Sequence, residues 1–368
     1  MDNAQRECRS ARGGAADVLR VSLPLVAAAL LTALNGFTDN LFLARHSDTA
    51  LRAALPANVF AGFVTMLATV TMGYSGTMLA RALGGKKPAR AVSTAANGLM
   101  LSFASALLFA AAAPLVRPLF LLFGHAPDIL EPECTLSNYL LAAGPLAVAA
   151  SVAAGYYAAQ GLTRAVAAAT AAGVVVKVSL TPLLVFGAGP FPEMGIEGAG
   201  AASITSHIAV CIAYAAAACG NPLAKSAARH PGLLAVRPAI ASEILRCGLP
   251  LCGQEVVGYG SFFALVALIG RLDPSSAAAS SAVFALNCPF NAVIIGFREG
   301  VEMLVGRAAG RKALAEISRT LKSACCIAVA LSLAYIAVLA AFRRELLEAF
   351  LSKDGGKIDL PADLCRAS

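Results

Sequence analysis

The chain contains no tryptophan, and only 14% of its 368 residues are charged, against about 25% in soluble domains. In contrast, 58% of the residues are hydrophobic and the mean hydropathy is +0.73. Backbone exposed to lipid must be helical or belong to a closed barrel, and the alternating pattern of barrel strands is absent. Because a soluble core cannot hide so many long apolar runs, the composition predicts an all-α polytopic membrane protein.

Several chemical motifs are missing as well. The ten cysteines form no CxxC pair and no Cys/His metal spacing, so the sequence supports neither a disulfide framework nor a metal site. Most lie within apolar runs, and Cys134 is the one expected in an outer loop. No nucleophile triad, P-loop or dinucleotide turn is present. We therefore expect no enzyme and no cofactor; an intramembrane transferase or protease would have to use Lys177 with Asp39.

The net charge of +8 is better explained by membrane topology than by nucleic-acid binding, because the basic residues lie in short loops without interleaved aromatics. With the N-terminus inside, eighteen Lys and Arg lie in inner segments and six in outer ones. This bias fits the positive-inside rule and predicts a multi-pass protein of the plasma (inner) membrane. Polar residues precede the first apolar run, and no cleavable signal peptide is evident. The nine expected spans are 21–44, 55–80, 91–116, 136–160, 166–187, 197–219, 243–270, 276–305 and 320–342.

The first span carries polar side chains in its second half. On a helix, Thr32, Asn35 and Asp39 share one side while the leucines point elsewhere. A carboxylate in a spanning helix costs about 2.5–3.5 kcal/mol even on insertion scales, and such residues usually face a bundle interior or a wet cavity. The alternative is that Asp39 reaches the membrane surface near Arg45.

An internal repeat organises the chain. At an offset of 226 residues, matching pairs are Leu23-Pro24 with Leu249-Pro250, Arg45 with Arg271, Arg81 with Arg307, Gly84 with Gly310, Lys86 with Lys312, Arg117 with Arg343, and Asp128 with Asp354. An even number of spans in each repeat gives two lobes related about the membrane normal, with a transport site at their interface.

The repeat predicts the domain organisation. A cytoplasmic segment 1–20 precedes a six-helix lobe 21–220, a cytoplasmic linker 221–242, a second lobe 243–345 and a polar tail 346–368. Only three spans follow the linker, so the second lobe is expected to be incomplete. We expect these three spans to be loosely packed, or completed by another polypeptide as partner.

Specific segments resemble the MATE family of multidrug and toxic compound extrusion antiporters. They are the two Leu-Pro openings, Asp39 ahead of LFLAR, GYSGTMLARALGGKKPARAVS ending at Ser93, and TPLLVFGAGPFPEMGIEGAG from Thr181 to Gly200. The resemblance covers residues 18–350 and nine of the family's usual twelve helices. It implies alternating access between two lobes, driven by a proton or sodium gradient, with export of organic, often cationic, compounds.

The resemblance also assigns residues. Asp39 stands where the family keeps its helix-one carboxylate. The family's helix-five Asn and Asp are replaced by Lys177 and Thr181, ahead of the matching Pro182, so both of these cation ligands are lost. The alternatives to drug export are a lipid or polysaccharide flippase of the same superfamily and a truncated, non-transporting remnant.

Two groups of residues are candidates for ion coupling and the substrate cavity. Lys177 and Thr181 share a helix face, and an ammonium flanked by VVV and VSL needs a carboxylate, for which Asp39 is the candidate; otherwise Lys177 snorkels to the inner surface. The eighth span carries a polar stripe facing a polar seventh span, unless Arg298 to Glu302 already lie at the inner interface. These residues are Gln254, Glu255, Tyr259, Asn287, Asn291, Arg298, Glu299 and Glu302.

Overall fold

The computed structural model describes residues 14–123, 127–187, 192–230, 232, 235–272 and 274–341. Within them, nearly all residues are helical, as the composition predicts. The long helices are α2 (Ala15–His46), α3 (Asp48–Gly84), α7 (Pro127–Ala159), α8 (Thr163–Val185), α9 (Ile196–Cys219), α11 (Pro238–Leu272), α12 (Pro274–Gly310) and α13 (Leu314–Ala341). Shorter elements are α4 (Pro88–Ala104), α5 (Ala106–Ala112), η1 (Ala113–Leu115), α6 (Val116–Leu122) and α10 (Pro222–Arg229).

Prolines mark the start of several helices. Helices α4, α7, α10, α11 and α12 all begin at a proline, which lacks the N–H that would be unpaired in a first turn.

Among the described residues, seven helical segments are long and apolar enough to cross a membrane: α2, α3, α4 to α6 taken together, α7, α8, α9 and α13. The other two expected spans correspond to α11 and α12, which are long helices but are not among these seven.

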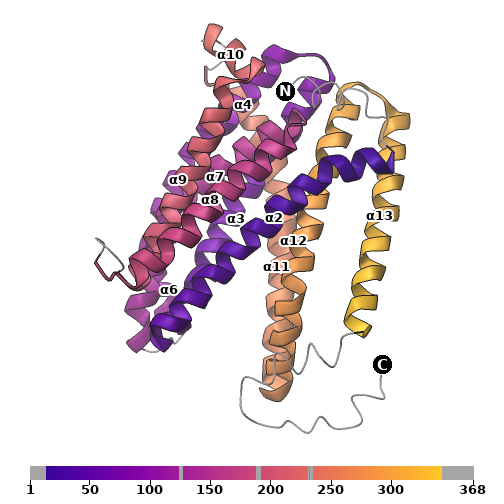
Figure 1. The fold of residues 1–368 in the computed structure, drawn as a ribbon. Coiled ribbons are helices and arrows are strands. Elements are labelled where there is room, and N and C mark those ends of the chain that lie inside the picture. Colours follow the sequence, from indigo (N-terminus) through magenta and orange to yellow (C-terminus); the bar gives the residue numbers. More distant parts are fainter. Residues whose placement is uncertain are drawn as a thin grey trace.

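Helices α2 to α9 form the first bundle. Helix α3 packs along α7, while α8 packs on α9 and α2. The core near its inner end includes Leu79, Tyr157, Val166 and Tyr214, and Met303 of α12 joins it. Helix α2 runs obliquely across the molecule (Figure 1), so that its first half lies on α12 and its second half on α8.

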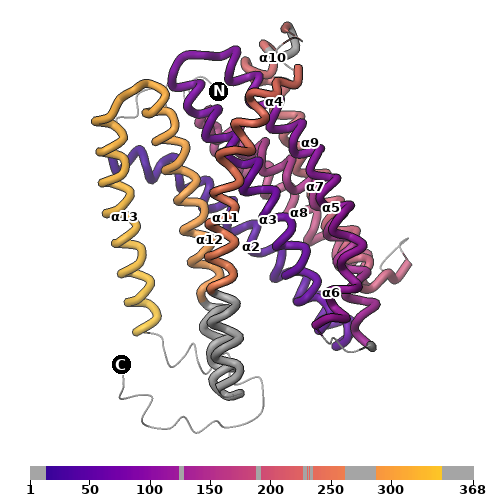
Figure 2. Tube along the Cα trace, turned by 180° about the vertical axis from the view of Figure 1, so that it is seen from behind, coloured from indigo at the N-terminus to yellow at the C-terminus, as the bar shows by residue number. Residues whose placement is uncertain are grey.

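Helices α11 to α13 lie on the other side of α2 and α3. Seen from behind, α11 and α12 run beside α3 (Figure 2), and α12 also packs along α2. Helix α13 contacts α12 and α2. However, only 6% of an apolar 18-residue stretch of α13 is buried inside the protein, against 28% of the corresponding stretch of α2. Helix α13 is thus the least buried of these seven segments, whereas α11 and α12 pack against the first bundle.

The internal repeat is visible in backbone detail. Lys86 and Lys312 both adopt positive φ, at 54° and 58°. The amide of Gly85 donates to the Arg81 carbonyl at 2.9 Å, and the amide of Arg311 donates to the Arg307 carbonyl at 3.1 Å. Both pairs are separated by the same 226 residues, so α3 and α12 end in the same turn and are equivalent elements of two repeats.

The segment before α7 differs from the prediction. We expected Cys134 in an outer loop, but α7 begins at Pro127, and Cys134 is a buried helical residue with 8% exposure. It packs with Leu130 and Phe120. The acidic composition of this segment suggested a loop, yet the proline start and the apolar contacts extend the helix through it. The expected linker likewise contains α10 and the first residues of α11.

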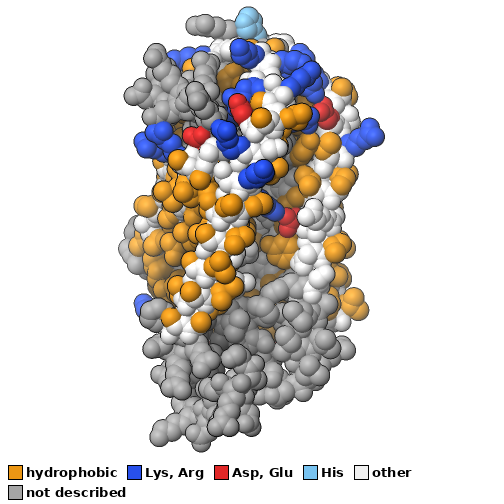
Figure 3. Space-filling model, turned by 90° about the vertical axis from the view of Figure 1, so that its right-hand side faces the viewer, with side chains coloured by type: hydrophobic (Ala, Val, Ile, Leu, Met, Phe, Trp, Pro, Cys, Tyr) orange, Lys and Arg blue, Asp and Glu red, His pale blue; other side chains and the backbone are white. Residues whose placement is uncertain are grey.

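Basic side chains gather at one end of the molecule. Figure 3 shows Lys and Arg concentrated at the end where α10 lies, with hydrophobic side chains over the middle of the same face. Arg81, Lys87, Arg307 and Lys312 belong to the turns at this end. The positive-inside rule predicts that this end faces the cytoplasm.

Candidate functional site

The first candidate site is a buried ion pair between α2 and α8. Lys177 Nζ lies 2.7 Å from Asp39 Oδ2, and the two side chains are only 8% and 7% exposed. Valines and leucines surround Lys177 in sequence, so α8 reaches this depth as an apolar helix with one cation. The pairing expected from the sequence is therefore confirmed, and the snorkelling alternative is wrong.

The pair retains unused hydrogen-bonding capacity. Among the described residues, neither Asp39 Oδ1 nor Asn35 Oδ1 has a hydrogen-bond partner, although both atoms are buried. Asp39 and Asn35 are one turn apart on α2, so two acceptor oxygens lie on one stretch of helix. Buried acceptors of this kind usually find a donor in protein, water or ligand. This stretch of α2 is consequently suited to receive a proton, a water or a substrate donor.

The two threonines expected at this site do not join the pair. Thr181 is buried, but its hydroxyl donates to the Lys177 carbonyl at 2.8 Å on its own helix. Thr32 is exposed and donates to the Ala28 carbonyl at 3.0 Å. Both hydroxyls are used locally, because a threonine in a helix can bond to the carbonyl four residues earlier.

His207 of α9 is a candidate that the sequence did not reveal. Its Nδ1 lies 2.8 Å from the Ser203 carbonyl. Since a carbonyl only accepts, Nδ1 carries the hydrogen. Helix α9 packs on α8, which carries Lys177. A single histidine in an apolar helix gave no sequence signal, because the packing of α9 on α8 is not visible in the sequence.

The second candidate site lies on α11 and α12. Arg298 Nη1 lies 2.7 Å from Glu255 Oε1, which links the two helices; the side chains are 59% and 28% exposed. Glu302 accepts a hydrogen bond from the Thr77 hydroxyl of α3. The charges of opposite sign expected on the seventh and eighth spans therefore do meet. Glu302 lies where α12 packs against α3 of the first bundle.

Glu299 follows Arg298 directly on α12, and its side chain is exposed. Met303, one turn further along α12, packs in the cluster that contains Tyr157 and Tyr214. Tyr214 stacks on Tyr157 with ring centroids 5.3 Å apart. Sequence reasoning missed both tyrosines, which stand in alanine-rich helices without a polar neighbour pattern.

The remaining candidates are Gln254, Tyr259, Asn287 and Asn291, whose side chains are exposed. The structure does not bring them to the Lys177–Asp39 pair. Within the described part of the chain, no group of three or more His, Cys, Asp or Glu is placed to hold a metal ion.

Helical segments long and apolar enough to cross a membrane, with a buried ion pair between two of them, define a polytopic helical membrane protein. The chain belongs to the MatE family: the family match covers residues 24–183 and 250–357. Members of this family are transporters rather than enzymes.

One relative is a probable multidrug resistance protein NorM from Pseudomonas putida. It is 28% identical over 295 residues, which is 78% of this chain and 63% of that protein. A NorM from Pseudomonas aeruginosa is 27% identical over 305 residues, 82% of this chain and 62% of that protein. The chain thus spans less than two thirds of the length of these relatives.

A solved structure supports the fold. A crystal structure of MATE in the bent conformation matches with a TM-score of 0.82 and 19% identity, over 96% of this chain and 78% of that one. Nearly the whole chain therefore follows the fold of these transporters.

Proposed function

We propose that the chain acts in the plasma membrane as a proton-coupled antiporter that exports organic cations by alternating access between its two lobes. The relatives named as probable multidrug resistance proteins support export of drug-like compounds. Within this chain, the proposal depends chiefly on one observation, the buried contact between Lys177 and Asp39.

The buried pair favours protons over sodium in the first lobe. Lys177 Nζ already occupies the position beside Asp39 that a bound cation would take. Removing either charge from a buried pair leaves the other uncompensated, at a cost of about 3–5 kcal/mol. Protonation of Asp39 would break the ion pair without bringing in a second cation, so the pair can respond to protons and change the packing of α2 on α8.

The charge of the second site supports a cationic substrate. Glu255, Glu299 and Glu302 are carboxylates, and Arg298 is the one cation among these four residues. Arg298 is bound to Glu255, so Glu299 and Glu302 give this stretch of α12 an excess of negative charge, and Met303 of the same stretch packs with Tyr157 and Tyr214. Aromatic faces and a carboxylate in a partly desolvated site attract organic cations.

The packing of the lobes supports alternating access. At the basic end, α3 and α12 are in backbone contact at Gly84 and Gly310, so the two repeats are closed there. The equivalent turns of α3 and α12 meet there, together with contacts of Arg307 with Ala159 and of Arg90 with Glu243, and rocking of one repeat on the other would open this end.

The test is transport by the full chain in proteoliposomes. We expect saturable uptake of ethidium when a proton gradient is imposed, and none from a sodium gradient of equal size. Asp39→Asn should abolish uptake. Asp48→Asn is the matched control, because Asp48 is exposed at the start of α3.

Three outcomes would contradict the proposal. Uptake driven by sodium alone would show the wrong coupling ion. Movement of a lipid-linked saccharide without ion dependence would identify a flippase. Uptake that survives Asp39→Asn would remove the role of the buried pair.

A further inference from the structure

The basic end of the molecule contains a reciprocal joint between the repeats. A side-chain carbon added at Gly84 would collide with the backbone of Arg307, and one added at Gly310 would collide with the backbone of Arg81. Each glycine thus lies against the residue that precedes its counterpart by one helical turn. The two turns interlock, and their basic side chains are forced together.

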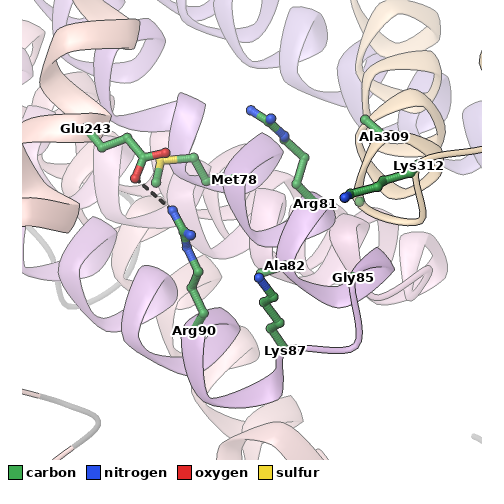
Figure 4. A pocket seen from close by; sticks show the side chains of 10 residues that line it. Met78, Arg81, Ala82, Gly85, Lys87, Arg90, Glu243, Ala309 and Lys312 are labelled. Atoms are coloured by element: carbon green, nitrogen blue, oxygen red, sulfur yellow. Dashed lines mark hydrogen bonds and ion pairs between the residues drawn. The ribbon is translucent and has the colours of Figure 1, made fainter.

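A pocket of about 210 Å³ opens beside this joint. It is several times the volume of one water molecule, about 30 Å³. Figure 4 shows side chains from both repeats around it: Arg81, Lys87 and Arg90 from the first, and Lys312 from the second. Glu243 of α11 completes the charged lining. Closure of the joint therefore builds a pocket in which basic residues outnumber acidic ones.

Most of this positive charge is not neutralised. Arg90 Nη2 lies 2.9 Å from Glu243 Oε2. Among the ion pairs of the described residues, none takes up Arg81, Lys87 or Lys312. Like charges brought together repel one another, so closing the joint carries an electrostatic cost that a bound anion would offset.

We propose that this pocket binds a phosphate-bearing anion, and that its binding stabilises the state in which the two repeats are closed at the cytoplasmic end. Arginine and lysine are the usual ligands of phosphate oxygens. The anion is either the headgroup of an acidic phospholipid in the inner leaflet or free inorganic phosphate. Because the pocket includes residues of both repeats, an anion that fits it binds the closed state better, and this difference shifts the population.

The proposal does not depend on which compound or ion the chain transports. It concerns the distance between the repeats, which is measured directly. We would place spin labels at Ala89→Cys on α4 and Ala315→Cys on α13, in a background without other cysteines. Both positions are exposed near the joint on opposite repeats.

The full chain is reconstituted into phosphatidylcholine nanodiscs and titrated with inorganic phosphate at constant ionic strength. A second set of nanodiscs contains phosphatidylglycerol and no phosphate. We expect the short-distance population to rise and saturate with at least one of the two anions. A response to inorganic phosphate identifies free phosphate as a ligand, and a response only to phosphatidylglycerol identifies the lipid headgroup.

Matched variants distinguish anion binding in this pocket from general attraction of anions to the basic end of the molecule. Lys87→Gln with Lys312→Gln should weaken the response on the order of a hundredfold, about tenfold for each of the two charged hydrogen bonds lost. Arg319→Gln with Lys322→Gln removes the same charge from exposed sites of α13 outside the pocket and should leave the response unchanged. Glu243→Gln frees Arg90 and should strengthen it severalfold, which a misfolded variant would not do.

Two results would overturn the proposal. One is a short-distance population that responds to neither anion. The other is an equal loss of response in the Arg319 and Lys322 variant, which would show attraction to the whole basic surface instead of a pocket.

Discussion

Lys177 Nζ of α8 and Asp39 Oδ2 of α2 lie 2.7 Å apart inside an apolar helical bundle. The two residues are separated by 138 positions in the chain. The MATE resemblance implies an asparagine and an aspartate at the positions of Lys177 and Thr181, so this chain has a fixed cation where that pattern has an amide. The pair thus links α2 to α8 within the first lobe, at the residue proposed to sense protons.

The first prediction is a double-mutant cycle on this pair. Asp39→Asn and Lys177→Met should each lower the free energy of unfolding by about 3–5 kcal/mol, because each leaves one buried charge unpaired. The double variant should be more stable than either single variant. Thermal unfolding of the purified chain in detergent measures all four proteins. Additive losses would show that the two charges do not depend on each other.

The second prediction concerns the reciprocal joint. Gly84→Ala places a carbon against the backbone of Arg307, which cannot move aside as a side chain can. We expect the ends of α3 and α12 to separate and the labelled distance between Ala89 and Ala315 to lengthen. Gly73→Ala is the control on the same helix, because nothing lies within 4 Å of its added carbon. A normal distance in Gly84→Ala would show that the joint tolerates the extra atom.

The third prediction concerns topology. In a background without other cysteines, Arg52→Cys at the start of α3 should react with a membrane-impermeant maleimide in intact cells. Lys87→Cys, at the basic end, should react only after permeabilisation, as the positive-inside rule requires. A variant that retains only native Cys134 should react slowly under both conditions, because Cys134 is buried. The opposite labelling pattern would reverse the orientation of every helix.

The fourth prediction concerns the charges proposed to attract the substrate. Arg298→Gln should strengthen ethidium binding about two- to fivefold, since it removes a repulsive cation, and Glu255→Gln should weaken it by a similar factor. Pairs as exposed as this one contribute only about 0–1 kcal/mol, so stability should change little. Ethidium fluorescence measures the affinity, with Arg319→Gln as the control. A change of the same sign in both variants would count against the electrostatic account.

Some features of the site could be predicted because they lie along one helix. The turn-by-turn spacing of Arg298 and Glu302 on α12, and the lone lysine in α8, were evident before any packing was known. The partner of Lys177 was also predictable, because the first lobe offers few buried carboxylates. By contrast, the packing of α9, which carries His207, on α8, and of Met303 against Tyr157 and Tyr214, joins helices whose facing sides depend on helix rotation and crossing. No periodicity within a single helix carries that information.

The sequence by itself determined the class of fold, the order of the nine long helical segments, the expected sidedness and the internal repeat. It could do so because lipid allows a long apolar run little choice except a helix, and because basic residues mark the inner ends. Only the tertiary structure decided that Cys134 is buried, that Gly84 and Gly310 interlock with Arg307 and Arg81, and that basic residues of both repeats share one pocket. These features depend on close packing between segments distant in the chain, where the absence of a single side-chain carbon sets how near two helices can approach.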